Sequence, residues 1–315
     1  MLSNLPVVLP IFALILAGWI ARRSQALGPH ATREVNRLVV YLALPALLFD
    51  IMAKAKWAEI WQPGFILAFA TGCAAIFGLT LWLRMRMRQG CHLADAAIDA
   101  LNASYANTGF LGFPLVLAVV GGSGMGATLV ATILTVCVLF AVAIVLIESG
   151  LRSAARRRDI AWKTFAALAR NPLLVAPAAG ALFMATGWPL PEPLDRFLQL
   201  LGGAASPCAL IALGLFLAGN RSERRRPAGI RVETLLVGLK LFAQPAITWL
   251  VAAPVLGLPP AAVHTAVLLA ALPTGTGPFM LAEFYEREAA RTSRVVLATT
   301  VLSVATLSLY LVVAG

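Results

Sequence analysis

Apolar segments, each close to the length of one membrane crossing, alternate with short basic loops along nearly the whole chain. A helix needs about 20 apolar residues to cross the hydrocarbon core of a bilayer. The pattern therefore predicts an all-α integral membrane protein with ten transmembrane helices. They are expected at residues 5–21, 35–53, 63–83, 96–120, 127–148, 164–186, 195–219, 232–254, 261–283 and 293–313.

The composition agrees with this interpretation and excludes several other classes of protein. Of the 315 residues, 60% are hydrophobic and only 12% are charged, which is too little polar surface for a water-soluble globule. The net charge of +11 lies in short clusters between apolar segments, so it indicates membrane topology rather than a nucleic-acid partner. The four cysteines show no metal-ligand spacing, and we expect neither a metal site nor a cofactor.

The basic clusters fall in every second loop, near residues 22–37, 84–88, 152–163, 221–231 and 287–294. Positively charged loops stay on the cytoplasmic side of a membrane. The alternation therefore predicts that both termini lie on the non-cytoplasmic side. It also divides the chain into two five-helix halves, residues 1–150 and 151–315, and an odd number of crossings in each half gives them opposite orientations.

Matched irregularities support such an inverted repeat. The second crossing of each half carries a proline, Pro45 or Pro207. The fourth crossing of each half, which is the fourth and the ninth of the chain, is broken by glycine, proline and polar residues at 107–114 and 272–278. Breaks of this kind are tolerated at membrane depth only inside protein or beside a watery cavity.

The two broken helices suggest a binding site. They enter from opposite sides, so the half-helices after the breaks point their amino ends, each with about half a positive charge, at one another. An anion held between them would receive backbone hydrogen bonds without a basic side chain. The candidate substrate-binding residues at the breaks and beside them are Asn107, Thr108, Gly109, Pro114, Thr274, Gly275, Thr276, Pro45 and Pro207.

Charged residues near this site leave two interpretations open. Lys240, deep in the eighth crossing with Gln244 one turn further, would contact the anion or pair with a carboxylate such as Asp99; alternatively it extends to the cytoplasmic interface. Asp95 and Asp99 are candidates for coupling to H⁺ or Na⁺, or are ordinary charges at a helix amino end.

Four stretches resemble the auxin efflux carrier family of secondary transporters: Leu44–Phe49, Asn107–Leu115, Leu272–Gly275 and Leu297–Ser303. The resemblance implies a ten-helix fold similar to that of bile-acid sodium symporters. In that fold the crossing broken helices mark the substrate site and one domain moves against the other. The short central loop is similar to that of compact bacterial members in the inner membrane, which are associated with malonate or malate.

The resemblance leaves an auxin-like aromatic carboxylate exporter as an alternative. Auxin carriers place an asparagine at each crossover, whereas this chain has Asn107 at the first and threonines at the second. The expected partners are a small organic anion and membrane lipid, with a homodimer as one open oligomeric state. A channel is a further alternative, as is an intramembrane serine protease in which Ser123 would need hydrogen-bond reach to His264.

Overall fold

The computed structural model describes residues 5–56, 61–87, 91–151, 169–219 and 230–314. Within these ranges the regular secondary structure is helical, and β-structure is limited to one isolated bridge. The start of the predicted sixth crossing, residues 164–168, and most of the basic loops at 152–163 and 221–231 lie outside the described residues.

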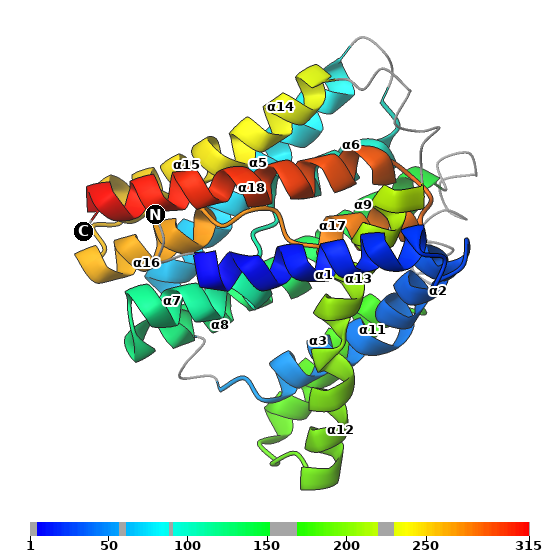
Figure 1. Ribbon diagram of the computed structural model, residues 1–315. Coiled ribbons are helices and arrows are strands. Elements are labelled where there is room, and N and C mark those ends of the chain that lie inside the picture. Colours follow the sequence, from blue (N-terminus) through cyan, green and yellow to red (C-terminus); the bar gives the residue numbers. More distant parts are fainter. Residues whose placement is uncertain (1–4, 57–60, 88–90, 152–168, 220–229, 315) are drawn as a thin grey trace.

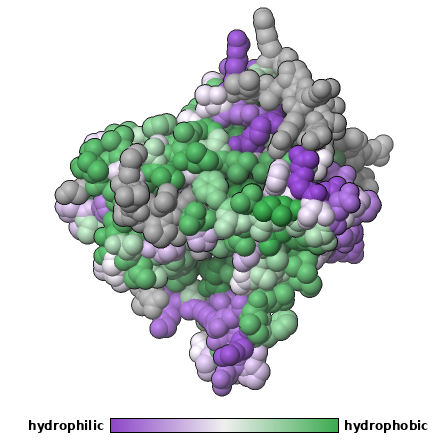
Figure 2. All heavy atoms as spheres, in the orientation of Figure 1, coloured by the Kyte–Doolittle hydropathy of each residue, from purple (hydrophilic) through white to green (hydrophobic). Residues whose placement is uncertain are grey.

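Six of the described helical stretches are long and apolar enough to cross a membrane, which confirms an all-α integral membrane protein. They are Ala31–Ala53, Pro63–Arg86, Gly122–Leu151, Glu192–Gly219, Arg231–Val255 and Ala289–Val313. Their outward side chains are apolar as well, including Trp82, Phe242 and Val312. Figure 2 shows apolar residues over much of one face, with polar residues gathered toward its edges.

The helices pack in two groups that each combine the first and second halves of the sequence (Figure 1). In the small bundle, α1 packs along α13, and α3 packs against α11 and α12. Its members are α1 (Leu5–Arg23), α2 (Ala31–Leu38), the π-helical turn η2 (Val39–Ala43), α3 (Leu44–Ala53), α11 (Pro172–Thr186), α12 (Glu192–Gly203) and α13 (Ala205–Gly219).

In the large bundle, α6 packs against α5 and α9, and α15 packs against α5 and α16. Its first members are α5 (Pro63–Arg86), α6 (Leu93–Ser104), η3 (Thr108–Gly112), α7 (Phe113–Val119), η4 (Gly122–Gly124), α8 (Met125–Thr132), η5 (Ile133–Leu139) and α9 (Phe140–Leu151). The later members are α14 (Ile230–Gly238), η7 (Leu239–Ala243), α15 (Gln244–Leu250), η8 (Val251–Val255), α16 (Pro260–Ala270), α17 (Gly277–Phe284) and α18 (Ala289–Ala314).

Prolines explain several local departures from α-helix. The π-helical turns η2, η3 and η7 each end two residues before a proline, at Pro45, Pro114 and Pro245. A proline has no N–H to donate to the carbonyl four residues earlier, and the preceding turn widens in response. Pro207 instead lies in the first turn of α13, where the helix restarts after Ala204, so it ends a break rather than kinking a continuous helix.

One close helix contact fixes α15 against α5. Gly72 of α5 faces Thr248 of α15, and a Cβ built on Gly72 would lie 2.1 Å from Thr248 Oγ1. Thr248 is fully buried and its hydroxyl donates to Gln244 O at 2.9 Å, so it has little freedom to move. The missing side chain at this glycine therefore sets the distance between the two helices.

We expect Gly72→Ala to destabilise the protein by about 1–3 kcal/mol, because an overpacked buried contact must be relieved by moving backbone. Thermal unfolding in detergent would measure the loss. Gly78→Ala in the same helix is the matched control, since a Cβ there meets nothing within 4 Å. Adding Thr248→Ala to Gly72→Ala should restore part of the stability; equal unfolding temperatures for the Gly72 and Gly78 variants would contradict the packing argument.

Candidate functional site

The two broken helices meet where their extended segments pair. Helix α6 ends at Ser104 and helix α16 ends at Ala270, and a short non-helical segment, residues 105–107 or 271–276, joins each to its following half-helix. Ala106 and Thr274 form an antiparallel bridge, in which the Asn107 N–H donates to Pro273 O at 2.9 Å and the Gly275 N–H donates to Tyr105 O at 3.1 Å. Each break thus supplies the other with hydrogen-bond partners that the bilayer interior lacks.

Threonine side chains secure this crossing. The Thr274 hydroxyl donates to Asn102 O at 2.8 Å, and the Thr274 N–H donates to Thr299 Oγ1 of α18 at 3.2 Å. On the other segment, the hydroxyls of Thr108 and Thr135 lie 2.9 Å apart in a hydrogen bond. Thr274 therefore faces α6 and α18 and does not line the cavity described next.

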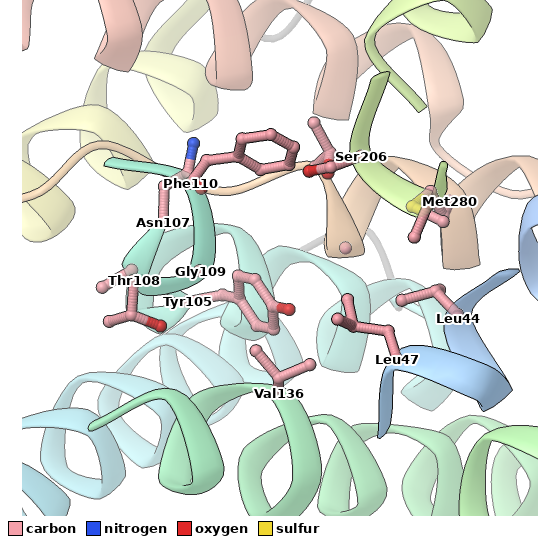
Figure 3. Close-up of a pocket in the computed structure, with 14 residues that line it drawn as sticks. Leu44, Leu47, Tyr105, Asn107, Thr108, Gly109, Phe110, Val136, Ser206 and Met280 are labelled. Atoms are coloured by element: carbon pink, nitrogen blue, oxygen red, sulfur yellow. The ribbon is translucent and has the colours of Figure 1, made fainter. Parts of the chain in front are cut away.

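A small, partly open cavity of about 60 Å³ lies between the crossing and the small bundle (Figure 3). None of the described residues that line it is charged. They are Leu44, Leu47, Tyr105, Ala106, Asn107, Thr108, Gly109, Phe110, Val136, Ala205, Ser206, Thr276, Gly277 and Met280. Four of the predicted residues, Asn107, Thr108, Gly109 and Thr276, are thus brought together.

The amino ends of both later half-helices open into this cavity. The first residues of η3 and the first of α17, Gly277, line it, and neither N-cap side chain, Asn107 or Thr276, caps its helix. A Cβ built on Gly109 would meet nothing within 4 Å, so there is free space at the amino end of η3. Because no N-cap side chain covers either amino end, the partial positive charge at both ends favours an anion in this space.

Tyr105 is a cavity residue that sequence reasoning missed. Its ring lies against the crossing, where a Cβ on Gly275 or Gly277 would come within 2.8 Å of ring carbons. Figure 3 shows its hydroxyl directed into the cavity, where it could donate to a bound carboxylate. Gly275 therefore makes room for Tyr105 rather than for a ligand. Ser206 was missed too, although it directly precedes the predicted Pro207.

The predicted prolines lie beside the cavity rather than in its wall. Pro45 stands between Leu44 and Leu47, which line it, and Pro207 follows the lining residue Ser206. Pro114 lies in the first turn of α7.

Lys240 and Gln244 are both fully buried and neither lines the cavity. The Lys240 ammonium donates to Ala270 O at 2.8 Å, and the Gln244 amide donates to Ser104 O at 2.9 Å. Lys240 thus neither extends to the interface nor pairs with Asp99, contrary to two of the expectations.

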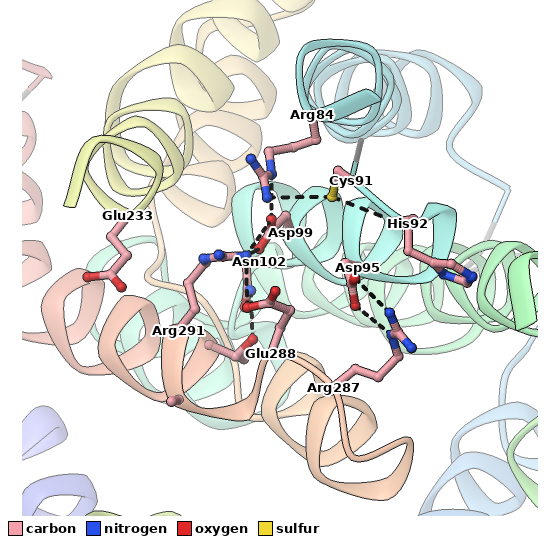
Figure 4. Close-up of polar contacts among 12 residues, drawn as sticks. Arg84, Cys91, His92, Asp95, Asp99, Asn102, Glu233, Arg287, Glu288 and Arg291 are labelled. Carbon is pink, nitrogen blue, oxygen red and sulfur yellow. Dashed lines mark hydrogen bonds and ion pairs between the residues drawn. The ribbon is translucent and has the colours of Figure 1, made fainter. Parts of the chain in front are cut away.

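Asp95 and Asp99 form ion pairs away from the cavity (Figure 4). Asp95 accepts two hydrogen bonds from Arg287, at 2.6 and 2.8 Å. Asp99 is fully buried between Arg84, at 2.7 Å, and Arg291, at 3.0 Å. In the nearby loop, burial raises the pKa of the Glu288 carboxyl, and Arg291 at 2.9 Å opposes that shift. These pairs join α6 to α5 and to α18.

Ser123 and His264 each have other partners. The Ser123 hydroxyl donates to Val120 O at 3.4 Å in a glycine-rich turn, and His264 Nδ1 lies 3.0 Å from the Tyr310 hydroxyl. Among the residues with described positions, no three His, Cys, Asp or Glu side chains gather as a metal site.

The chain is similar to known transport proteins over nearly its whole length. The family described as "Membrane transport protein" matches residues 5–311. The "Putative malonate transporter" of Rhizobium meliloti is 31% identical over 310 residues, covering 98% of this chain and 95% of that protein. The "Uncharacterized transporter YfdV" of Escherichia coli K12 is 27% identical and covers 69% of each chain.

A plant relative links the chain to the auxin efflux carriers, the family that the sequence resembles. The "Probable auxin efflux carrier component 5c" of rice is 31% identical over 152 residues, which are 47% of this chain and 40% of that protein. The matching family and these relatives are transporters and not enzymes, so the serine protease interpretation is wrong. The chain is an integral membrane protein that belongs to the membrane transport protein family, as the auxin efflux carriers do.

Proposed function

We propose that the protein is a secondary active carrier that moves a small organic anion across the bacterial inner membrane by alternating access. The observation that carries this proposal is the pair of amino helix ends that open into one cavity whose described lining residues carry no charge. Two partial positive charges at a site with no basic side chain among its described residues suit an anion that must bind and then leave.

We assign the substrate to mono- or dicarboxylates such as malonate or malate. The hydroxyls of Tyr105 and Ser206 would bind carboxylate oxygens, while Leu47 and Met280 would cover a short carbon chain. The relative named as a malonate transporter, which matches nearly end to end, supports this class. An auxin-like aromatic carboxylate is the second candidate, favoured by Phe110 in the cavity wall and by the rice relative.

The proposed topology has ten crossings in two inverted repeats, residues 1–150 and 151–315, with both termini on the non-cytoplasmic side. In support, the two broken helices cross as the repeat requires, and α1 begins and α18 ends toward the same side of the molecule (Figure 1). Coupling to H⁺ or Na⁺ belongs to the same proposal. Asp95 and Asp99 are its candidate carboxylates, since each could exchange an arginine for the coupling ion.

Alternating access would move the large bundle against the small one, as in an elevator. Three contacts from α2 and η2 to α17 and the loop after it join the bundles on one side of the cavity. Asn36 Nδ2 donates to Met280 O at 3.3 Å, the rings of Tyr41 and Phe284 meet edge to face at 5.7 Å, and Arg33 pairs with Glu286 at 3.6 Å. Opening that side requires these contacts to separate.

Reconstituted protein should catalyse saturable uptake and counterflow of one or more carboxylates. The measurement uses liposomes and labelled malonate, malate, a monocarboxylate and indole-3-acetate, under imposed sodium, proton or voltage gradients. Dependence on one gradient would identify the coupling ion. Uptake no faster than in empty liposomes for every acid would contradict the carrier proposal, and uptake that does not saturate would indicate a channel.

Gly109→Ala should weaken transport without unfolding the protein, because its new methyl group enters the space at the amino end of η3. We expect KM for the transported acid to rise about tenfold or more, since a methyl there displaces the anion from the N–H groups. Gly78→Ala, equally free of steric conflict but distant from the cavity, is the matched control. Equal KM values for the two variants, at equal expression and unfolding temperature, would place the anion elsewhere.

A reversible cross-link between Tyr41→Cys and Phe284→Cys should stop transport, because it joins η2 of the small bundle to α17 of the large bundle. The four native cysteines are first replaced, and uptake is measured after treatment with a short bis-thiol reagent and again after reduction. Each single-cysteine variant serves as the control. Full transport by a protein that is shown to be cross-linked would mean that these helices do not separate.

A further inference from the structure

Two side chains on one helical segment reach the carboxyl ends of both broken helices. Lys240 donates to Ala270 O, the carbonyl of the last residue of α16, at 2.8 Å. Gln244, four residues further, donates to Ser104 O, the carbonyl of the last residue of α6, at 2.9 Å. Both side chains are fully buried, so neither contact is an incidental surface interaction.

The chemistry of these ends explains the residue types. The last carbonyls of a helix have no partner within the helix, and together they carry about half a negative charge. A buried ammonium is costly unless it is paired, and a helix carboxyl end is one of the few neutral groups that favour it. Lys240 and the end of α16 therefore stabilise one another.

The surrounding structure holds both donors in place. Gln244 Nε2 also lies 3.3 Å from Cys73 Sγ of α5, and its backbone carbonyl accepts from the Thr248 hydroxyl. Pro245 and the π-helical turn before it shift the position of Lys240 relative to Gln244. The contact between Gly72 and Thr248 then fixes α15 close to α5.

The two caps lie apart from the cavity. Its wall at the crossing consists of residues 105–110 with Thr276, Gly277 and Met280, whereas the caps bind residues 104 and 270. At the crossing, the two negative helix ends are therefore capped by α15 and its preceding turn, and the two positive ends are left to the cavity.

We propose that Lys240 and Gln244 are positioning residues for the anion site, capping the two carboxyl helix ends so that the crossing presents only positive charge to the substrate. This inference rests on the proposed anion transport. In it, Lys240 acts on the anion through its charge and never by contact. The affinity for a dianion should therefore depend on the charge of Lys240 more strongly than the affinity for a monoanion of similar size.

The experiment compares uptake of labelled malonate with that of its monomethyl ester in liposomes. Lys240→Gln removes the charge and retains an N–H donor for Ala270 O, on a side chain that is one atom shorter. We expect its KM for malonate to rise at least about fivefold, and by a smaller factor for the monoester, with little change in maximal rate. Lys240→Arg should remain within about threefold of the native KM for both substrates.

Lys54→Gln is the control for the change in net charge, because Lys54 pairs with Asp50 at the end of α3, outside the crossing. It should leave both KM values within about twofold. Gln244→Glu provides an independent test, because it places a hydrogen-bond acceptor against Ser104 O. It should also raise the KM for malonate more than the KM for the monoester.

Each outcome distinguishes the inference from the function on which it rests. Native protein that transports neither acid would contradict the anion proposal itself. If the native protein transports both acids and the two variants, Lys240→Gln and Gln244→Glu, raise KM equally for both, the role of Lys240 and Gln244 is purely structural. If KM is unchanged in both variants, the two residues have no role in substrate binding. Either result would overturn the electrostatic inference and leave the carrier intact.

Discussion

The backbone pairing around Ala106 and Thr274 is the constraint on which the rest of the structure depends. A helix broken at membrane depth exposes N–H and C=O groups that cost several kcal/mol each when they find no partner. Here each break supplies the partners of the other, through Asn107 with Pro273 and Gly275 with Tyr105. Neither break would be stable alone, and their mutual requirement brings four helix ends to one place.

The electrostatics of the site follow from that arrangement. Two carboxyl ends and two amino ends meet at the crossing, and the sign presented to the cavity depends on which ends are capped. Lys240 and Gln244 bind the carboxyl ends, whereas the N-cap side chains of η3 and α17 leave the amino ends uncapped. A cavity with no charged side chain among its described residues can thus favour an anion, and it would do so without a fixed ligand charge that would retain the substrate.

The local sequence predicted that the two helices are broken, but it did not predict where each break begins and ends or which residues pack against it. Glycine, proline and polar residues at 107–114 indicated a weak helix, but the extended segment is 105–107 and Pro114 lies within the first turn of α7, where proline is tolerated. The limit is set by pairing with residues 273–275, which no local pattern contains. Tyr105 and Ser206 were missed for the same reason: their roles depend on packing between distant helices. The burial of Lys240 could be predicted from its place in the eighth crossing, but its hydrogen-bond partner depends on how η7 and α15 align with α16.

The division of contacts between the bundles also bears on how the site would move. The groups that secure the crossing, Lys240, Gln244, Thr135 and Thr299, all belong to the large bundle. The small bundle contributes to the described cavity wall only Leu44, Leu47, Ala205 and Ser206, and three of these are apolar. Sliding along such a wall breaks few hydrogen bonds, whereas separating the two halves of the crossing would expose backbone groups to the membrane interior. The proposed motion therefore keeps the crossing intact and shifts it as one body, and it is opposed by side-chain contacts of α2, η2 and α13 with α17 and the loop after it.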